Sequence, residues 1–299
     1  QEAGIYEGKP YILPLSYTCP AMIATAEGLG GSGFDEAAAS GGTADYVREL
    51  LALPKEMRPY LDVSLPSLLM NAPSVSPVSV QEAEIRLDMP AWQDTLEQAG
   101  LVLADYEGSE EDFFAAIDTE TCIQNGAVIL AGAAVDPGYS LRVIEDAGHT
   151  ARLLPIPNEK GSLTMTPCIT AAVSAGCENT GSAADLLLFL LGDTVQGSGT
   201  LESSGSAAGL IGSGTSWPVR RGCAEKILEQ LSIQPVQPGE ISEILKADLQ
   251  SMEERADVCR LAGRYDGRLY LLAKPYLDGE MSWEECYAGI EKEWSYLDE

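Results

Sequence analysis

Residues 127–135 read AVILAGAAV, a run with no charged or polar side chain that is bounded by a glycine and a proline. A continuous apolar run of this length is typical of a central strand that is buried on both faces of its sheet. Amphipathic helices are expected before it, one over residues 88–99 and another that begins at Ser109. Buried strands that alternate with such helices indicate an α/β layer architecture.

The other segments are predicted as helices, strands or connectors from their capping residues, apolar periodicity and turn-forming composition. Helices are predicted where apolar positions recur at spacings of three or four, over residues 43–53, 182–191, 222–231 and 241–259, and from the capping box of Ser282 and Glu285 onward. Extended segments are expected over residues 4–14 and 162–174. Connectors rich in Gly, Ser, Ala or Pro are expected over residues 28–42, 72–79 and 196–216.

The composition is that of a globular protein and excludes some classes of partner. The 299 residues, 45% of them hydrophobic, suffice for one large core or two ordinary ones, so a bilobed or two-domain chain is expected. The 46 acidic and 18 basic residues give a net charge of -28, which repels nucleic acid and anionic lipid alike. The most apolar stretch, residues 186–191, is far shorter than the roughly twenty residues that span a bilayer. No basic and then apolar leader follows Gln1, so any export signal is expected to have been removed or left out.

The residue types that usually carry enzyme chemistry are scarce. His149 is the only histidine, and no serine has glycine two residues before and two after it, as a nucleophile elbow requires. Residues 28–33 satisfy G-x-G-x-x-G, but they lie in a low-complexity segment followed by Asp35 and Glu36, whose charge disfavours a phosphate. The seven cysteines form no C-x-x-C pair and are interpreted mainly as small core residues. No cofactor and no metal are therefore expected.

Three segments, in the same order, resemble the extracellular solute-binding proteins (family 1 type) of ABC importers. Residues 6–14 are similar to that family's G-K-x-Y-x-x-P strand, which crosses between two lobes. Residues 154–196, followed by residues 214–220, resemble its LP-x-P-x-x-x-G segment, return strand, apolar helix with a trailing Q, here Gln196, and G-x-x-P-V turn. Residues 276–286 and 296–299 resemble its terminal Y-x-x-G-x-x-S-x-E-E-A helix and Y-L-x-E ending.

The resemblance implies a periplasmic-binding-protein-like fold of type II, with one complete lobe and part of a second. Residues 1–14 would form the crossing strand from the N-terminal lobe, and residues 15–163 the first part of the C-terminal lobe. Residues 164–216 would be a partial segment of the N-terminal lobe, and residues 217–299 the helical completion of the C-terminal lobe. The first part of the N-terminal lobe is expected to be missing from this sequence.

The resemblance also implies a function and a ligand site. The chain is expected to bind a small-molecule solute, with a sugar or oligosaccharide favoured, and to deliver it to the membrane permease of an ABC importer. Binding would occur by lobe closure without chemistry, outside the cell, and the full-length protein would be lipid-anchored. Ser16, Tyr17 and Thr18, which follow the crossing strand, and Trp217, at the later turn, are the candidate ligand contacts. Tyr17 and Trp217 would stack on a sugar ring, while Thr18 would donate a hydrogen bond.

One departure from the family pattern bears on the ligand. Many sugar binders of that family carry a tryptophan just after the central strand, whereas residues 132–135 here read GAAV. This difference weighs against a carbohydrate. Tyr139, in the following segment, is the candidate to replace that tryptophan, although its Pro137-Gly138-Tyr139 context also fits a simple turn.

Two functions from other classes remain open at the level of sequence. The first is a surface interaction or structural module that is derived from a solute-binding protein, keeps one lobe and has lost transport. The second is a secreted glycosidase, which requires two carboxyl groups roughly 5 to 10 Å apart in an open groove. A chain with 46 acidic residues offers many such pairs, and their spacing in sequence does not reveal which of them face each other.

Overall fold

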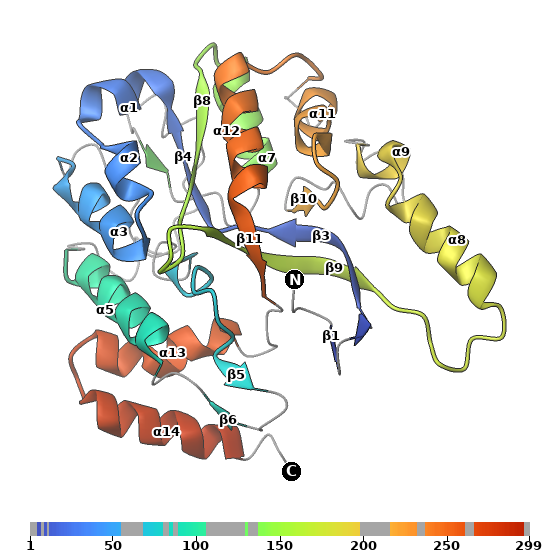
Figure 1. Cartoon of the computed structure of the whole chain (residues 1–299). Helices are drawn as coiled ribbons and strands as arrows, with labels where there is room; N and C mark the ends of the chain where they lie inside the picture. Colours follow the sequence, from blue (N-terminus) through green and yellow to red (C-terminus); the bar gives the residue numbers. More distant parts are fainter. Residues whose placement is uncertain are drawn as a thin grey trace.

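The structure is a computed structural model, and it describes most of the chain. The described residues are 5–6, 9–10, 12–54, 68–79, 84–85, 89–105, 129–130, 137–197, 216–231, 237–260 and 266–295. Strands and helices alternate over this part, as the sequence predicts (Figure 1).

The described strands form four sheets. They are β1 (Ile5–Tyr6), β2 (Lys9–Pro10), β3 (Leu13–Thr18), β4 (Ala21–Thr25), β5 (Val78–Ser79), β6 (Glu84–Ile85), β7 (Ile129–Leu130), β8 (Ala151–Pro155), β9 (Leu163–Ala171), β10 (Trp217–Pro218) and β11 (Ala256–Cys259). The largest sheet has the order β10-β3-β9-β11, and the second has the order β7-β4-β8. β3 and β9 are antiparallel, and β11 is parallel to β9.

Helices pack on the two larger sheets. They are α1 (Ala26–Ser32), α2 (Glu36–Ala39), α3 (Thr43–Ala52), α5 (Pro90–Asp105), α7 (Pro137–Asp146), α8 (Thr180–Leu190), α9 (Asp193–Gln196), α11 (Cys223–Gln230), α12 (Glu243–Arg255), α13 (Asp266–Leu277) and α14 (Trp283–Ser295). Figure 1 shows α3, α5, α13 and α14 on one side of the molecule and α8 and α9 on the opposite side, beyond β10.

The apolar interior falls into two large clusters and one small one. The first cluster lies among α3, α5, α13 and α14 around the fully buried Trp92, and the second lies between the sheets and α7, α11 and α12 around Leu141, Ile144 and Leu245. Burial of such side chains is the main favourable term in folding. The third cluster, beneath α8 and α9, has only Leu15 and Val195 as buried members among the described residues.

Several helices begin where the sequence predicts. The backbone N–H of Ser282 donates to Glu285 at 3.0 Å, and the N–H of Glu285 donates to the Ser282 hydroxyl at 3.2 Å, which confirms the capping box. α3, α8 and α11 start and end within two residues of their predicted bounds. The helix expected over residues 88–99 is present, but it continues through Gly100 to Asp105.

Two predicted segments differ from the structure. The connector expected over residues 28–42 contains α1 and α2, because the side chains of Thr25 and Asp35 cap their first turns and outweigh the poor helix propensity of glycine. The helix expected to reach Cys259 ends at Arg255, and residues 256–259 form β11. Parallel pairing with β9 supplies backbone hydrogen bonds there in place of a further helical turn.

Other expectations are tested only in part. Ile129 and Leu130 form β7, so the predicted strand is present there, while the rest of residues 127–135 lies outside the described part. In the sheet as described, the central position belongs to β4, whose five residues are all buried, and β7 pairs along its edge. The helix expected from Ser109 lies outside the described residues, as does most of the connector over residues 196–216.

The cysteines have more varied surroundings than the sequence suggests. Cys223 and Cys286 are buried, as expected of core residues, whereas Cys168 is exposed in the last five residues of β9, where exposed and half-buried side chains alternate. Cys19, Cys177 and Cys259 are partly exposed. All six described cysteines are free thiols, and position 122 lies outside the described residues.

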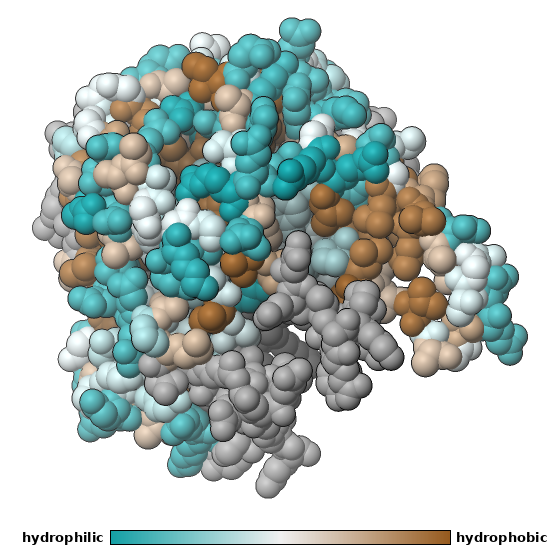
Figure 2. Space-filling view, viewed as in Figure 1, coloured by the Kyte–Doolittle hydropathy of each residue, from teal (hydrophilic) through white to brown (hydrophobic). Residues whose placement is uncertain are grey.

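Helix α8 differs from every other long helix in its exposure. None of its residues is buried, although it carries the apolar Leu186, Leu188 and Phe189, all more than half exposed. Figure 2 shows apolar side chains gathered on this part of the surface, around α8 and α9. A helix that is apolar all round is usually an internal one.

The exposure of α8 predicts a contrast between two leucine substitutions. Leu188→Ala is expected to change the free energy of unfolding by less than about 0.5 kcal/mol, because Leu188 is 67% exposed. The matched control Leu249→Ala, on α12, is expected to cost about 2–5 kcal/mol, because Leu249 is 2% exposed. Urea denaturation measures both. A large cost at Leu188 would show that α8 packs against other parts of this chain in solution.

Candidate functional site

The junction of β3, β9 and β10 brings together four of the five residues that the sequence singles out. β10 pairs antiparallel with β3, so that Trp217 lies opposite Tyr17 and Pro218 lies opposite Ser16. Ser16, Tyr17 and Trp217 are all buried, and the two aromatic residues belong to the second apolar cluster. Residues 200 positions apart in the chain thus share one side of the strand pair β3–β10.

Thr18 and Thr166 complete the junction. Thr18 is half-buried and pairs with Thr166 on β9, and its hydroxyl donates to the Thr166 carbonyl at 3.4 Å. The pairing of β3 with β9 shifts register on both sides of Ser16, as in a β-bulge, and such irregularities redirect side chains.

Two hydroxyls at the junction have no hydrogen-bond partner among the residues that the structure describes. They are the Oγ of Ser16, which is fully buried, and the Oγ1 of Thr166, which is buried on β9. A buried polar atom without a partner costs about 1–3 kcal/mol, so such atoms need an explanation. Sequence reasoning missed Thr166, because its position opposite Thr18 depends on the cross-strand register.

Tyr139 lies elsewhere. It is half-buried in the first turn of α7, where Pro137 fits a helix start better than the turn that its sequence also suggests. The main packing partners of α7 are β4, β8 and α11. Tyr139 is therefore not part of the strands β3, β9 and β10, and a ligand contact there stays a prediction.

Burial keeps the titratable groups at the junction neutral. It raises the pKa of Tyr17 well above its usual range, with smaller contributions from Cys19 and Glu253. Burial also raises the pKa of the Cys19 thiol to about 12, so the thiolate that a nucleophilic cysteine needs is not formed near neutral pH. The junction thus offers neutral hydroxyls and aromatic rings, which suits binding of a neutral solute.

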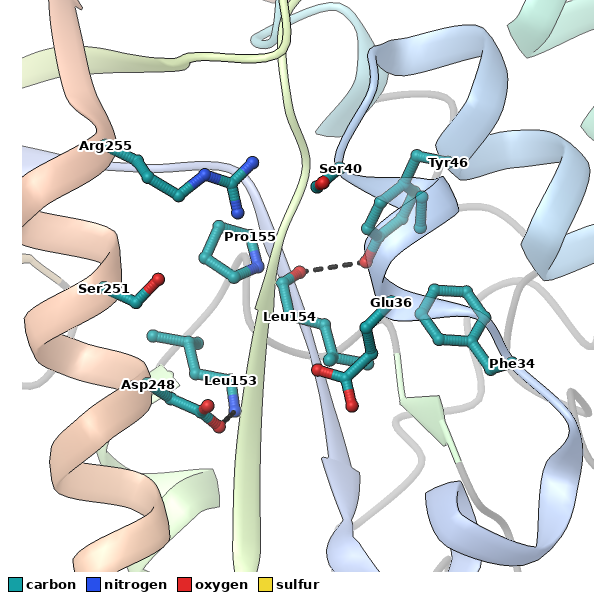
Figure 3. Close-up of a pocket in the computed structure, with 11 residues that line it drawn as sticks. Phe34, Glu36, Ser40, Tyr46, Leu153, Leu154, Pro155, Asp248, Ser251 and Arg255 are labelled. Atoms are coloured by element: carbon teal, nitrogen blue, oxygen red, sulfur yellow. Dashed lines mark hydrogen bonds between the residues drawn. The ribbon is translucent and has the colours of Figure 1, made fainter.

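A small hollow lies between α2, α3, β8 and α12 (Figure 3). Its volume is about 80 Å³, and Phe34, Tyr46 and Arg255 are among its lining residues. The Tyr46 hydroxyl donates to the Leu154 carbonyl at 2.9 Å, which fixes one wall. Pockets for drug-sized ligands are roughly 300–1,000 Å³, so this hollow suits water better than a sugar.

A larger open groove of about 730 Å³ runs between α11 and α12. Its lining is polar, and the Lys246 ammonium in it is already held by Glu225, Glu229 and Glu243 at 3.1–3.5 Å. Neither this groove nor the hollow of Figure 3 is lined by Ser16, Tyr17 or Trp217.

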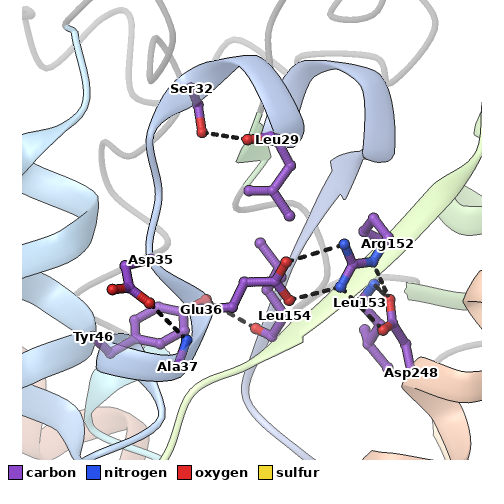
Figure 4. Close-up of polar contacts among 10 residues, drawn as sticks. All are labelled: Leu29, Ser32, Asp35, Glu36, Ala37, Tyr46, Arg152, Leu153, Leu154 and Asp248. Carbon is purple, nitrogen blue, oxygen red and sulfur yellow. Dashed lines mark hydrogen bonds and ion pairs between the residues drawn. The ribbon is translucent and has the colours of Figure 1, made fainter.

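An ion-pair network joins α2, β8 and α12 beside the small hollow (Figure 4). The Arg152 guanidinium contacts Glu36 and Asp248, each at 2.7 Å, and Asp248 also accepts the N–H of Leu153 at 3.0 Å. Burial raises the pKa of Asp248, and the hydrogen bonds from Arg152 and Leu153 oppose that rise. These two carboxylates are therefore engaged in holding elements together and are poorly placed to act as a glycosidase pair.

The part of the chain that is described contains no group of three metal-ligating side chains, and no helix in it is long and apolar enough to cross a membrane.

Comparison with known proteins identifies the fold. No protein-family model and no curated protein matches the sequence. Among solved structures, the sugar-binding protein MalE of Xanthomonas citri aligns with a TM-score of 0.63 at 12% identity, over 99% of this chain and 71% of its own. The chain has the fold of solute-binding proteins.

Two further solved structures agree with this assignment. A Streptococcus pneumoniae solute-binding protein in complex with the blood group A-trisaccharide has a TM-score of 0.53 at 10% identity, over 99% of this chain and 73% of its own. An ABC substrate-binding protein of Listeria monocytogenes in complex with cycloalternan has a TM-score of 0.51 at 12% identity, over 99% and 74%. The periplasmic-binding-protein-like α/β fold predicted from sequence is thereby confirmed.

The ion-pair network predicts a pH-dependent effect of Arg152→Met. Without the guanidinium, the pKa of Asp248 rises further above its unfolded value. A carboxyl group with a raised pKa destabilises the fold when it is ionised, and the penalty disappears below its unfolded pKa. The loss of stability relative to the parent is therefore expected to be larger near pH 7 than near about pH 4.

Chemical denaturation at the two pH values measures this difference. Arg48→Met is the matched control, because Arg48 pairs with Asp45 at the exposed surface and is expected to contribute little at either pH. An equal loss for Arg152→Met at both pH values would contradict the role assigned to Asp248.

Proposed function

We propose that this chain binds a sugar or oligosaccharide for an ABC importer at the junction of β3, β9 and β10, without chemical conversion. The observation that carries the proposal is that Ser16 Oγ and Thr166 Oγ1 are buried without a hydrogen-bond partner among the described residues, at the junction where Tyr17 and Trp217 lie opposite each other. Two proteins with this fold have been solved in complex with cycloalternan and with the blood group A-trisaccharide, which supports a carbohydrate ligand.

The chemistry of the junction fits such a ligand. Sugar hydroxyls are both donors and acceptors, so they satisfy a side-chain hydroxyl in either role. Aromatic rings give large apolar contact area and stack on the apolar face of a sugar ring. Thr18, half-buried at the end of β3, adds a further hydroxyl. A polar group that has no partner in the ligand-free protein gains one when the ligand binds, and so it favours the ligand-bound state. Closure that is linked to binding requires such a difference between the two states.

Access to the junction requires movement. Ser16, Tyr17 and Trp217 are buried in the described conformation, so a ligand reaches them only if the strands or the elements over them separate. Hinge motion at a few element-terminal residues is the usual way in which two-lobed binding proteins open. The irregular pairing around Ser16 is a suitable place for it.

The lobe division belongs to the same proposal. Residues 164–216 are assigned to a second lobe, and residues 15–163 with 217–299 to the first. The exposed apolar helix α8 supports this division, since it has the composition of an internal helix but is not covered by the described residues. A membrane permease as partner, an extracellular location and a lipid anchor complete the proposed role.

A structural or interaction module remains the second candidate. The exposed apolar side chains of α8 favour it, because large exposed apolar patches commonly mark interaction surfaces. The two candidates differ in whether a small solute stabilises the chain.

A thermal-shift screen separates these functions. Cycloalternan, the blood group A-trisaccharide and other neutral oligosaccharides are tested beside amino acids and peptides. At a hundred times its dissociation constant, a true ligand is expected to stabilise the protein by about 2.7 kcal/mol. Stabilisation by oligosaccharides alone supports the proposal. An unchanged melting temperature across the panel favours the interaction module, and stabilisation only by amino acids or peptides contradicts a carbohydrate ligand.

Removing an unpartnered hydroxyl predicts an unusual combination of effects. Ser16→Ala and Thr166→Val are expected to leave the ligand-free free energy of unfolding unchanged or to raise it, because neither hydroxyl has a hydrogen bond to a described residue. Both are expected to weaken oligosaccharide binding by about tenfold, since one hydrogen bond is worth about 1 kcal/mol or somewhat more. Denaturation and isothermal titration measure the two quantities.

Thr43→Val is the matched control. Thr43 is equally buried, but its hydroxyl donates to the Pro157 carbonyl at 2.7 Å, so its removal is expected to lower stability by about 1 kcal/mol and leave binding unchanged. A loss of stability at Thr166 as large as that at Thr43, with no change in binding, would contradict the site.

A further inference from the structure

Gln196 is a fully buried polar residue whose amide contacts three separate segments. Its Nε2 donates to the carbonyl of Leu15 at 3.1 Å and to that of Leu190 at 3.0 Å. Its Oε1 accepts the backbone N–H of Arg220 at 3.4 Å. Leu15 lies on β3, Leu190 ends α8, and Arg220 follows β10.

Residues 172–197, which carry α8 and α9, are here called the arm, and the rest of the described protein is called the body. Gln196 and Leu190 lie in the arm, whereas Leu15 and Arg220 lie in the body, so these hydrogen bonds connect the two. The inner half of β9 is buried in the body, while its last five residues, 167–171, alternate between half-buried and exposed as the strand runs out to the arm (Figure 1). Leu15 and Leu190 belong to the small cluster beneath the arm, which has few buried members. Since the described residues give the arm little buried apolar contact, its directional hydrogen bonds are expected to matter more.

The chemistry of the amide matches this position. A glutamine offers two donors and an acceptor on one planar group, so it bonds two carbonyls and one N–H at the same time. Glutamate lacks the donors, and methionine, which has a similar volume, lacks both. An ion pair between Asp193 and Arg220 reinforces the same connection from the exposed side.

We propose that Gln196 is a positioning residue that fixes the angle between the arm and the strands β3 and β10. Its bonds to Leu15 and Arg220 fall one residue before Ser16 and three after Trp217, so the orientation of the arm is coupled to the strands that carry the candidate ligand contacts. The coupling to ligand rests on the proposed solute-binding function; the hydrogen-bonded connection itself does not.

Hydrogen–deuterium exchange of the ligand-free protein tests the connection with two variants. Gln196→Met keeps the volume and removes the hydrogen bonds. Asn158→Leu is the matched control, because Asn158 is an equally buried amide that bonds Ser162 at 3.1 Å, Thr164 at 3.3 Å and the N–H of Lys160 at 2.9 Å within the body. Both variants lose a buried amide and are expected to unfold at a lower temperature than the parent.

The expected result separates positioning from general stability. Gln196→Met is expected to raise exchange in α8 and α9 by about tenfold while α12 stays protected, whereas Asn158→Leu leaves the arm at the parental rate. Equal increases in the arm and α12, or none in the arm, would overturn the proposal. If cycloalternan binds the parent, Gln196→Met is also expected to weaken that binding more than Asn158→Leu at matched stability. Because exchange is measured without ligand, a failure of sugar binding leaves the first result intact.

Discussion

The antiparallel pairing of β3 with β9 is the constraint on which the rest of the structure depends. β3 runs into β4 and β9 follows β8, so this pair connects the sheet β10-β3-β9-β11 along the chain to the sheet β7-β4-β8. Ile156 donates its N–H to the Pro20 carbonyl at 2.8 Å, which continues the pairing of β4 with β8 toward β3 and β9. β10 and β11 add to either side of the pair, and through them the C-terminal helices are attached. The junction with its buried hydroxyls, and the arm beyond it, both follow from this one pairing.

Local signals in the sequence predict much of this fold. Caps such as Ser282 mark helix starts because their hydrogen bonds are made within one turn, and the order of strands and helices indicates the α/β class. The failures have equally physical causes. α1 was concealed by its three glycines, and β11 was concealed because an apolar helical spacing continues into it while pairing with the distant β9 decides its conformation.

The candidate site was only partly visible in the sequence. Tyr17 and Trp217 meet as expected from their positions after two crossing segments, but nothing in either segment shows that Thr166 faces Thr18 or that Gln196 spans three segments. The first relation depends on cross-strand register, and the second depends on the residues after β10 lying beside Gln196. Tyr139, chosen from its place after a strand, lies in the first turn of α7, whose main packing partners are β4, β8 and α11.

The central claim is that a neutral saccharide satisfies the buried hydroxyls between β3, β9 and β10. A crystal structure of the chain soaked or grown with cycloalternan tests this most directly. The account predicts ligand density within hydrogen-bond distance of Ser16 Oγ and Thr166 Oγ1, with a sugar ring against Tyr17 or Trp217. Density in the hollow beside Tyr46 or in the groove between α11 and α12, with the two hydroxyls still unpartnered, would contradict it.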